Sequence, residues 1–379
     1  MKIIADENMP ALEETFAPGN ELIRLNGRQM TPQDVEDADV LLVRSITRVD
    51  QALLDNSKVR FVGSATIGID HLDTSWLDAN NICWANAPGC NADAAAQFTL
   101  SMMVLSCERL NRNFLQQSVG VVGRGNVGSR LVKLLQSLGS KVVACDPPLQ
   151  DAGQTGLVSM SECCEQDIVS IHVPLTSEGP NPTKHLFDQL QLAQLRPGTL
   201  LVNAARGGVV NAKALLHELN AQRLYAALDV WPDEPFIARQ LLDATTVATP
   251  HVAGSSVQGK RNGTLMIYQA FRRAFPHLAA EATVSQQVPT VAGCLEFPDD
   301  IGLQSALKQL LEASCPVARD DEMLRALKST TTEPNVHIDA LRSHYPRRNE
   351  FAAWAFEGAA IEVAKPLQRL GFSSTATSI

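Results

Sequence analysis

Residues 119–130 read VGVVGRGNVGSR, and this stretch decides the fold. A short run with strand character, 119–122, precedes Gly123, Gly125 and Gly128, which are spaced as G-x-G-x-x-G. A helical run follows, and the next apolar strand ends at Asp146, 18 residues beyond Gly128. A glycine turn between a strand and a helix, with an acidic residue at the tip of the next strand, is typical of a dinucleotide-binding unit. The alternative is a glycine turn in an ordinary strand–helix–strand unit.

Each part of this stretch has a physical role in the dinucleotide hypothesis. Gly123 permits the tight turn, Gly125 lets the backbone approach a pyrophosphate, and Gly128 lets the helix and strand pack closely. The N-terminus of the helix offers N–H groups and a partial positive charge to the phosphates. Asp146 is expected to accept hydrogen bonds from both ribose hydroxyls. Because no arginine follows it to hold a 2′-phosphate, the sequence favours NAD over NADP.

The composition excludes several classes of protein. A length of 379 residues predicts two or three domains, and the net charge of −9 argues against a nucleic-acid surface. No stretch approaches ~20 uninterrupted apolar residues, so no membrane span is predicted. The first residues, MKIIADENMP, carry acid where a signal peptide needs an apolar run. The eight cysteines lack metal-ligand spacing, which predicts a reduced cytoplasmic protein without a metal site.

The residues before the fingerprint predict a second α/β lobe. Short apolar runs at 2–5, 40–43 and 59–63 are typical of buried parallel strands. Small polar residues follow the later runs, with Arg44 and Ser45 after one and Thr66 after the next. Ligands bind at this edge of an open α/β sheet. A helix at 91–110 without a breaker is expected to connect this lobe to the fingerprint strand.

After Asp146 the alternation of strands and helices continues to about residue 275. Arg206, Glu234 and His251 each follow a predicted strand, so we expect their side chains to converge at the edge that carries the glycine turn. His251 has the intrinsic pKa of a general base, and Glu234 could hydrogen-bond its other ring nitrogen. Arg206 could bind a substrate carboxylate with two hydrogen bonds. Taken singly, each residue could equally be an ordinary loop or surface residue.

The motifs GRGNVGS, HVPLT, NAARGGVV, ALDVWPDEP and TPHVAG together resemble the D-isomer-specific 2-hydroxyacid dehydrogenases across about residues 1–275. This resemblance implies an α/β fold: a Rossmann-type doubly wound NAD domain at 94–255, inserted in a smaller flavodoxin-like α/β substrate domain at 1–93 and 256–285. It also implies Arg206, Glu234 and His251 as the catalytic set. The cofactor contacts that it implies are Gly123, Gly125, Asn126, Val127, Gly128, Asp146, Thr176, Ala204, Ala205, Arg206, Asp229 and Gly254.

Three features indicate one branch of this family: the short connection from the helix to the fingerprint, the signatures VRSITRV and GSATIGIDHLD, and the motif HYPRRNEF near the C-terminus. The resemblance implies oxidation of a small phosphorylated 2-hydroxy acid at C2, with reduction of NAD. It places Ser45 and Thr66 at the substrate, and Arg44 is a candidate phosphate ligand. Ser255 also belongs to the predicted substrate contacts, although it stands where we expect an aromatic residue.

The same resemblance implies a C-terminal α+β dimerisation domain at 286–379 and a homodimer through it. Arg347 and Arg348 form a basic pair in an otherwise acidic chain. We hypothesise that one of them reaches the site of a partner subunit; a solvated basic turn is the alternative.

Two competing functions remain open at this stage. The shared lobes do not separate this branch from other 2-hydroxyacid dehydrogenases, such as one acting on 3-phosphoglycerate or a glycerate or glyoxylate reductase. The same fold also serves NAD-sensing corepressors that bind peptides. A corepressor predicts a peptide-recognition surface, whereas this chain is expected to end in a folded module.

Overall fold

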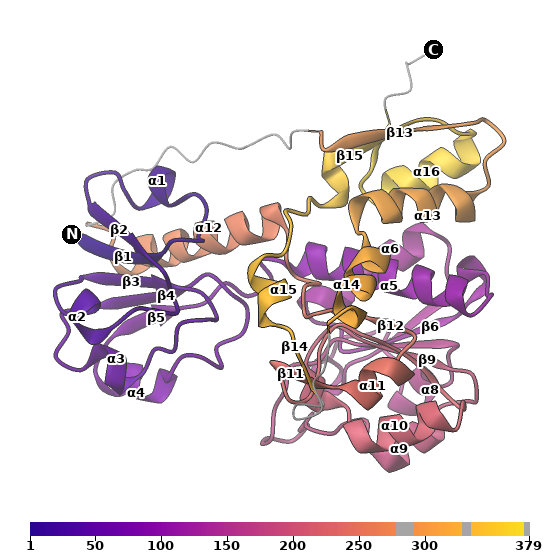
Figure 1. Ribbon diagram of the computed structural model, residues 1–379, viewed down its shortest axis with the longest axis horizontal. Coiled ribbons are helices and arrows are strands. Elements are labelled where there is room, and N and C mark those ends of the chain that lie inside the picture. Colours follow the sequence, from indigo (N-terminus) through magenta and orange to yellow (C-terminus); the bar gives the residue numbers. More distant parts are fainter. Residues whose placement is uncertain (278–290, 328–334, 375–379) are drawn as a thin grey trace. The chain divides into compact units, whose positions relative to one another are not determined.

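The computed structural model describes residues 1–277, 291–327 and 335–374 (Figure 1). The described residues form two compact units. The first contains residues 1–91 and 256–277, and the second contains residues 92–255 together with the described residues from 291 onward, here called the C-terminal segment. The predicted boundary between 285 and 286 lies outside the described residues, and the division into three domains stays a prediction.

A five-stranded parallel sheet forms the centre of the first unit, and its order β2-β1-β3-β4-β5 is that of flavodoxin-like folds. Two of these strands, both at the edges, were not predicted: β2 mixes apolar residues with Glu21 and Arg24, and β5 is only three residues long and partly exposed. The strands are β1 (Lys2–Asp6), β2 (Glu21–Leu25), β3 (Val40–Val43), β4 (Phe61–Ser64) and β5 (Cys83–Ala85).

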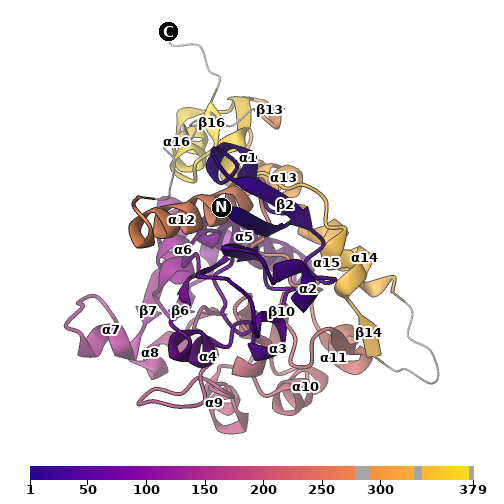
Figure 2. The same ribbon diagram turned by 90° about the vertical axis from the view of Figure 1, so that its left-hand side faces the viewer.

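Helices cover both faces of this sheet, as Figure 2 shows for the strands and helices at the front of the view. On one face α1 (Leu12–Thr15) and α12 (Val257–Ala274) share a core with alternate residues of β1 and β3. A Cβ on Gly63 would lie 2.2 Å from the Ile267 side chain, so glycine there lets α12 pack closely on β4. The other face carries α2 (Pro32–Val35), α3 (Gln51–Leu54) and α4 (Thr74–Ala79).

The second unit is built on six parallel strands in the order β12-β10-β9-β8-β6-β7, which confirms the predicted doubly wound sheet. The chain leaves β6 toward β7 on one side and returns to β8 on the other side, so the strand order reverses between β6 and β8. Ligands of open α/β sheets bind at such a point. The strands are β6 (Val119–Val122), β7 (Val142–Cys145), β8 (Ile168–Ile171), β9 (Leu200–Asn203), β10 (Tyr225–Leu228) and β12 (Val247–Ala248).

Two hydrophobic cores lie on the two faces of this sheet. One face carries α5 (Ala92–Arg109) and α6 (Asn126–Ser137). The predicted connector helix is therefore α5, and 14 of its 18 residues are buried, which explains why its apolar residues do not form a single stripe. The other face carries α8 (Met160–Cys164), α9 (Gln189–Gln194), α10 (Ala212–Asn220) and α11 (Arg239–Ala244), while α7 (Pro147–Asp151) and the short 3-10 helices Phe114–Gln116 and Gly207–Val209 lie between strands.

The C-terminal segment packs on the same unit rather than apart from it. Its helices α13 and α16 share one core with α5 and α6, and Leu324 of α14 belongs to the core on the other face. A small parallel sheet has the order β13-β15-β16, and β14 pairs antiparallel with β11. The elements are β11 (Phe236–Ala238), β13 (Gly293–Phe297), α13 (Leu303–Ser314), α14 (Val317–Arg325), β14 (Asn335–His337), α15 (Asp339–Ser343), the 3-10 helix Phe351–Ala353, β15 (Trp354–Gly358), α16 (Ile361–Arg369) and β16 (Ser373–Ser374).

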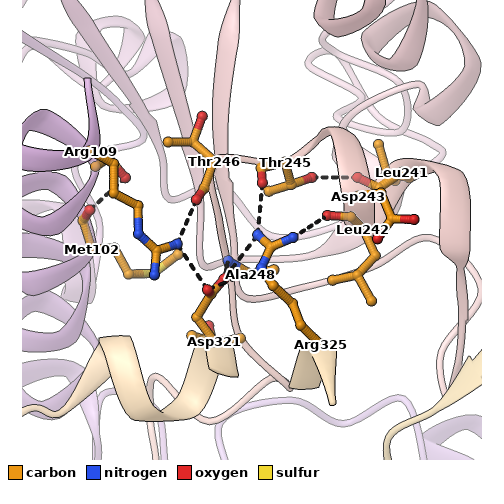
Figure 3. A network of polar contacts seen from close by, with 12 residues as sticks. Met102, Arg109, Leu241, Leu242, Asp243, Thr245, Thr246, Ala248, Asp321 and Arg325 are labelled. Atoms are coloured by element: carbon orange, nitrogen blue, oxygen red, sulfur yellow. Dashed lines mark hydrogen bonds and ion pairs between the residues drawn. The ribbon is translucent and has the colours of Figure 1, made fainter. Parts of the chain in front are cut away.

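Helix α14 protects the edge strand β12 through a network of charges (Figure 3). The Asp321 carboxylate accepts the Ala248 N–H at 2.7 Å and binds Arg109 at 2.8 Å and Arg325 at 3.0 Å. The two guanidinium groups also donate to backbone carbonyls, Arg109 to that of Thr246 and Arg325 to that of Thr245. A buried carboxylate therefore occupies a backbone donor of an edge strand, which would otherwise be open to another strand.

No helix in the described part of the chain is both long enough and apolar enough to cross a membrane.

Candidate active site

The glycine turn needs glycine at two positions for its own packing. Gly123 has a φ of 91°, and a Cβ there would lie 2.8 Å from the carbonyl carbon of His172. A Cβ on Gly128 would lie 1.9 Å from the carbonyl oxygen of Gly123. Glycine at these positions lets α6 begin almost directly after β6, as the dinucleotide hypothesis requires.

Gly125 serves a different purpose, because the packing of the chain does not demand glycine there. A Cβ on Gly125 would meet no atom of the described residues within 4 Å. Gly125 is also the N-cap of α6, and as a glycine it has no side chain with which to cap this helix. Asn126 and Val127 therefore present their N–H groups at an open helix N-terminus, which fits the pyrophosphate of a dinucleotide.

The Asp146 carboxylate is fixed beside the glycine turn. One oxygen accepts the Arg124 N–H at 2.7 Å, and the other accepts the Leu149 N–H at 3.1 Å. Each carboxylate oxygen can accept a second hydrogen bond, so this arrangement leaves capacity for ribose hydroxyls. The residues of the turn therefore fit NAD, and the bound cofactor would supply the hydride acceptor.

Two further residues follow β8 at the point where the strand order reverses. The His172 ring lies 2.8 Å from the Ser170 hydroxyl, and burial lowers the pKa of His172 to about 4, so the ring is neutral at pH 7. Thr176 lies in a loop closed by Thr183, whose hydroxyl accepts the Thr176 N–H at 2.8 Å. The structure thus places Thr176 on an ordered loop downstream of β8.

Arg206 lies in the loop after β9, and Asn203 at the end of that strand fixes the loop. The Asn203 amide donates to the Arg206 carbonyl at 3.0 Å and accepts the Ala205 N–H at 3.0 Å. A Cβ on Gly207 would lie 2.0 Å from the carbonyl oxygen of Trp231, so glycine lets the Arg206 loop touch the loop after β10. Ala204 and Ala205 are half-buried in the same loop.

Glu234 and His251 form a hydrogen-bonded pair. Nδ1 of His251 lies 2.6 Å from Oε2 of Glu234, and Oε1 of Glu234 accepts the Trp231 N–H at 2.9 Å. Burial raises the pKa of Glu234, but the hydrogen bond and charge of His251, the Trp231 N–H and the charge of Arg342 outweigh it, so the pKa lies below its ordinary value. His251 has a φ of 56°, an uncommon backbone conformation for a residue other than glycine. The pair predicted from the sequence is present, and Nε2 is left as the nitrogen that can meet a substrate.

Asp229 holds the loop that carries His251. Its buried carboxylate accepts hydrogen bonds from the Thr249 hydroxyl at 2.6 Å, the Val252 N–H at 2.9 Å and the Ala253 N–H at 3.0 Å. The Trp231 indole also donates to the Thr249 carbonyl at 3.0 Å. The loops after β10 and β12 are therefore tied together. Asp229 was predicted to contact the cofactor, and the described contacts give it the further role of orienting the histidine loop.

Gly254 and Ser255 lie at the end of that loop. The Ser255 N–H donates to the Val252 carbonyl at 2.8 Å, which closes a turn around Gly254. The Ser255 carbonyl accepts a hydrogen bond from Arg348 at 3.2 Å. Gly254 and Ser255 are both half-buried. Their predicted contacts with cofactor and substrate stay predictions.

The position of Arg348 contradicts one half of the hypothesis that either arginine of the basic pair could reach a partner subunit. Its side chain is buried, and the residue is only 4% exposed. It donates to the carbonyls of Ala253 at 2.5 Å and Ala94 at 3.4 Å, and its guanidinium lies 5.0 Å from the centre of the Phe98 ring. Arg348 is therefore a structural residue of its own subunit, whereas the neighbouring Arg347 is exposed.

The first unit gathers its predicted residues at one edge of its sheet. Arg44 and Ser45 follow β3, and Thr66 follows the adjacent parallel strand β4. Thr66 shares a hydrogen bond of 2.8 Å with the Ser64 hydroxyl, which also lies 2.8 Å from Nε2 of His71. Burial lowers the pKa of His71, so the neutral ring supports this polar chain.

Sequence reasoning missed the residues that support the site rather than form it. Asn203, Trp231, Ser64 and His71 all lie inside the sequence motifs that resemble the family, so their positions carried a signal. No signal in the sequence marked Arg342, because this residue lies 108 positions from Glu234.

Comparison with known proteins agrees with this geometry. Residues 103–253 match the family model described as D-isomer specific 2-hydroxyacid dehydrogenase, NAD binding domain. The chain is 42% identical over 379 residues to the erythronate-4-phosphate dehydrogenase of Pseudomonas putida, an alignment that covers 98% of this chain and 99% of that protein. It is 41% identical to the erythronate-4-phosphate dehydrogenase of Acinetobacter baylyi, with coverages of 93% and 98%.

Solved structures share the fold at lower identity. The NAD⁺-bound 3-phosphoglycerate dehydrogenase of Entamoeba histolytica has a TM-score of 0.64 at 21% identity, and covers 76% of this chain and 99% of its own. The NAD-complexed formate dehydrogenase of Staphylococcus aureus has a TM-score of 0.59 at 22% identity, with coverages of 74% and 97%.

The chain belongs to the D-isomer-specific 2-hydroxyacid dehydrogenase family, and it is an NAD-dependent dehydrogenase. Within that family it groups with the proteins named erythronate-4-phosphate dehydrogenase. This is the branch that the short connector, the N-terminal signatures and the HYPRRNEF motif predict, and the comparisons confirm it.

Proposed function

We propose that this enzyme oxidises 4-phospho-D-erythronate at C2 to (R)-3-hydroxy-2-oxo-4-phosphooxybutanoate, with reduction of NAD, as a step of pyridoxal phosphate biosynthesis. The observation that carries the proposal is the 42% identity to a protein named erythronate-4-phosphate dehydrogenase over nearly the full length of both chains. The Glu234–His251 pair and the open glycine turn supply the chemistry that this reaction needs.

His251 is the proposed base of the reaction. As the C2–H bond transfers hydride to the cofactor, the C2 hydroxyl must lose its proton, and a neutral imidazole can take it on Nε2. Glu234 holds Nδ1 at 2.6 Å, which fixes the tautomer and stabilises the imidazolium that forms. In the reverse direction the protonated ring returns the same proton to the carbonyl oxygen.

Arg206 is proposed to bind the substrate carboxylate, because a guanidinium matches a carboxylate with two parallel hydrogen bonds. Its loop is fixed by Asn203 and Gly207, which limits the positions that the side chain can take. In the first unit, Ser45, Thr66 and Arg44 are the proposed ligands of the remaining hydroxyl and phosphate groups. Ser255 offers a hydroxyl rather than an aromatic ring, and we propose a weaker substrate contact there.

The experiment that tests the proposal compares NADH formation from 4-phospho-D-erythronate and from 3-phosphoglycerate. We expect a kcat/KM at least about 100-fold higher for the erythronate, and a loss of about 10²- to 10⁴-fold in His251→Ala. His217→Ala, on α10, is the matched control and should keep wild-type activity.

Each other result of this assay identifies a different function. A preference for 3-phosphoglycerate would keep the fold and the catalytic residues but exclude the proposed substrate. Binding of NADH without turnover of either acid would instead favour an NAD-sensing protein.

We further propose that the enzyme is a cytoplasmic homodimer that associates through its C-terminal segment. The described cysteines are all free, as expected of a protein from a reducing compartment. The exposed apolar side chains of Val291 and Ile361 lie on this segment, where they could enter an interface. Sedimentation of the full chain measures the state directly: a monomer at all accessible concentrations would exclude the dimer.

A further inference from the structure

We propose that Arg342, from the C-terminal segment, is a positioning residue that holds the Glu234 carboxylate against His251 and keeps a positive charge behind it. The proposal rests on the catalytic roles proposed for Glu234 and His251. It makes the C-terminal segment a part of the catalytic apparatus within one subunit, in addition to any role in dimerisation.

The contact is made to the carboxylate oxygen that matters most. Nη1 of Arg342 lies 3.6 Å from Oε2 of Glu234, and the same oxygen lies 2.6 Å from Nδ1 of His251. The Arg342 side chain is 31% exposed and that of Glu234 is 18% exposed, so the ion pair is partly shielded from water. Shielded charges interact more strongly than charges on an open surface.

Backbone pairing fixes Arg342 in register with Glu234. Strand β14 pairs with β11 immediately after the Glu234–Pro235 bond, and the Ile338 N–H donates to the Pro235 carbonyl at 3.0 Å. Ile338 is fully buried and precedes the first residue of α15, which carries Arg342 in its last turn. The position of Arg342 is therefore set by a strand pair and a buried anchor rather than by the ion pair alone.

Several charged groups surround the pair. Asp339, on the same helix, lies 3.8 Å from Nη1 of Arg342 and competes with Glu234 for it. His337 of β14 packs edge-on against Phe236, with ring centres 4.9 Å apart. The remaining neighbours are Asp233, exposed beside Glu234, Asp229, whose carboxylate binds the backbone of the His251 loop, and Arg206, whose loop touches Trp231.

The sign of the effect follows from these charges. The carboxylate of Glu234 stabilises the protonated form of His251, and the positive charge of Arg342 weakens that stabilisation. Arg342 thereby keeps His251 more readily deprotonated, which suits a base in the oxidation direction. Removing Arg342 should favour the protonated imidazole, while removing the competing charge of Asp339 should disfavour it.

The test is the pH dependence of kcat/KM for oxidation of 4-phospho-D-erythronate. The acid limb is the part of the pH profile in which kcat/KM falls as the pH decreases. In Arg342→Gln we expect this limb to move to higher pH by about half a pH unit, and in Asp339→Asn we expect a smaller shift to lower pH. Arg342→Lys keeps the charge and should restore most of the wild-type profile. Arg369→Gln, which removes an exposed arginine of α16 from the same segment, should leave the profile unchanged.

The reverse reaction gives a second reading, because the same group then acts as the acid. Its alkaline limb should move in the same direction as the acid limb of the oxidation in every variant. A general disturbance of folding would lower the rate without shifting the two limbs. It would also not produce an upward shift in Arg342→Gln and a downward shift in Asp339→Asn.

Three results would overturn the inference. The first is an acid limb unchanged in Arg342→Gln; the second is a raised KM for the phosphorylated substrate at an unchanged limb, which would make Arg342 a substrate ligand. If Arg342→Gln does not fold, an unshifted profile in Asp339→Asn counts in the same way. Failure of the proposed function is distinguishable, since wild-type enzyme would then lack activity on this substrate or keep it in His251→Ala.

Discussion

The glycine turn and the loops that carry Arg206, Glu234 and His251 lie at the same edge of one sheet, but they are built in opposite ways. The turn and its acidic residue, Gly123 to Asp146, occupy 24 consecutive positions. The loops that carry Glu234 and His251 are held by distant partners: Arg348 binds the Ala253 carbonyl across 95 residues, and Arg342 reaches Glu234 across 108. A local motif can be recognised in a sequence, whereas long-range support must be seen in the folded chain.

Gly128 and Gly125 separate packing from ligand binding within the local motif. In Gly128→Ala a Cβ would lie 1.9 Å from the Gly123 carbonyl oxygen, so we expect a loss of about 3 kcal/mol in the free energy of unfolding. In Gly125→Ala the Cβ would point into open space, so stability should stay near wild type while affinity for NADH falls. Denaturant unfolding and fluorescence titration with NADH measure the two effects.

A reversed pattern would contradict this division of roles. If Gly125→Ala bound NADH normally, the space in front of Gly125 would not be the pyrophosphate site. If Gly128→Ala were as stable as wild type, the turn would be able to relax away from its strand.

The difference between the two regions also explains how much the sequence revealed. The strand–glycine–helix unit, the six-stranded sheet and the Glu234–His251 pair follow from local patterns and from the rule that the carboxyl ends of parallel strands share one edge. Edge strands β2 and β5 did not, because Glu21 and Arg24 interrupt the apolar residues of β2 and β5 has only three residues. Arg347 and Arg348 are adjacent and identical, so only tertiary packing decides that one is exposed and the other buried.

Arg348 and Arg347 give the matching test for long-range support. Arg348→Met removes the donor for the carbonyls of Ala253, Ser255 and Ala94, and the unpaired buried carbonyls should cost about 2 kcal/mol of stability. We also expect a lower kcat, because Ala253 and Ser255 belong to the loop that follows His251. Arg347→Met, which removes an exposed side chain, should leave the melting curve unchanged.

The outcome decides whether the C-terminal segment supports catalysis or only assembly. Equal effects of the two substitutions, or an effect of Arg348→Met on dimerisation alone, would assign the segment to assembly. The Asp321 network offers a less direct test, because it binds the strand β12 that precedes the His251 loop rather than the loop itself.

The smallest expected effect concerns His172, which is next to the local motif because its carbonyl lies against Gly123. Burial lowers its pKa from 6.5 to about 4 in the folded chain. As the pH falls below 6.5, the unfolded chain takes up a proton on this ring before the folded chain does, so stability decreases until about pH 4. Because the residue as a whole is only half-buried, we expect about 1–2 kcal/mol from this group rather than the full value of the shift. His172→Gln, which keeps a hydrogen-bond partner for Ser170, should lose less stability than wild type between pH 6.5 and 4. If the free energy of unfolding of the two proteins changed equally with pH across that range, His172 would bind a proton with the same affinity in the folded and unfolded chains. The end of β8 would then be open to water.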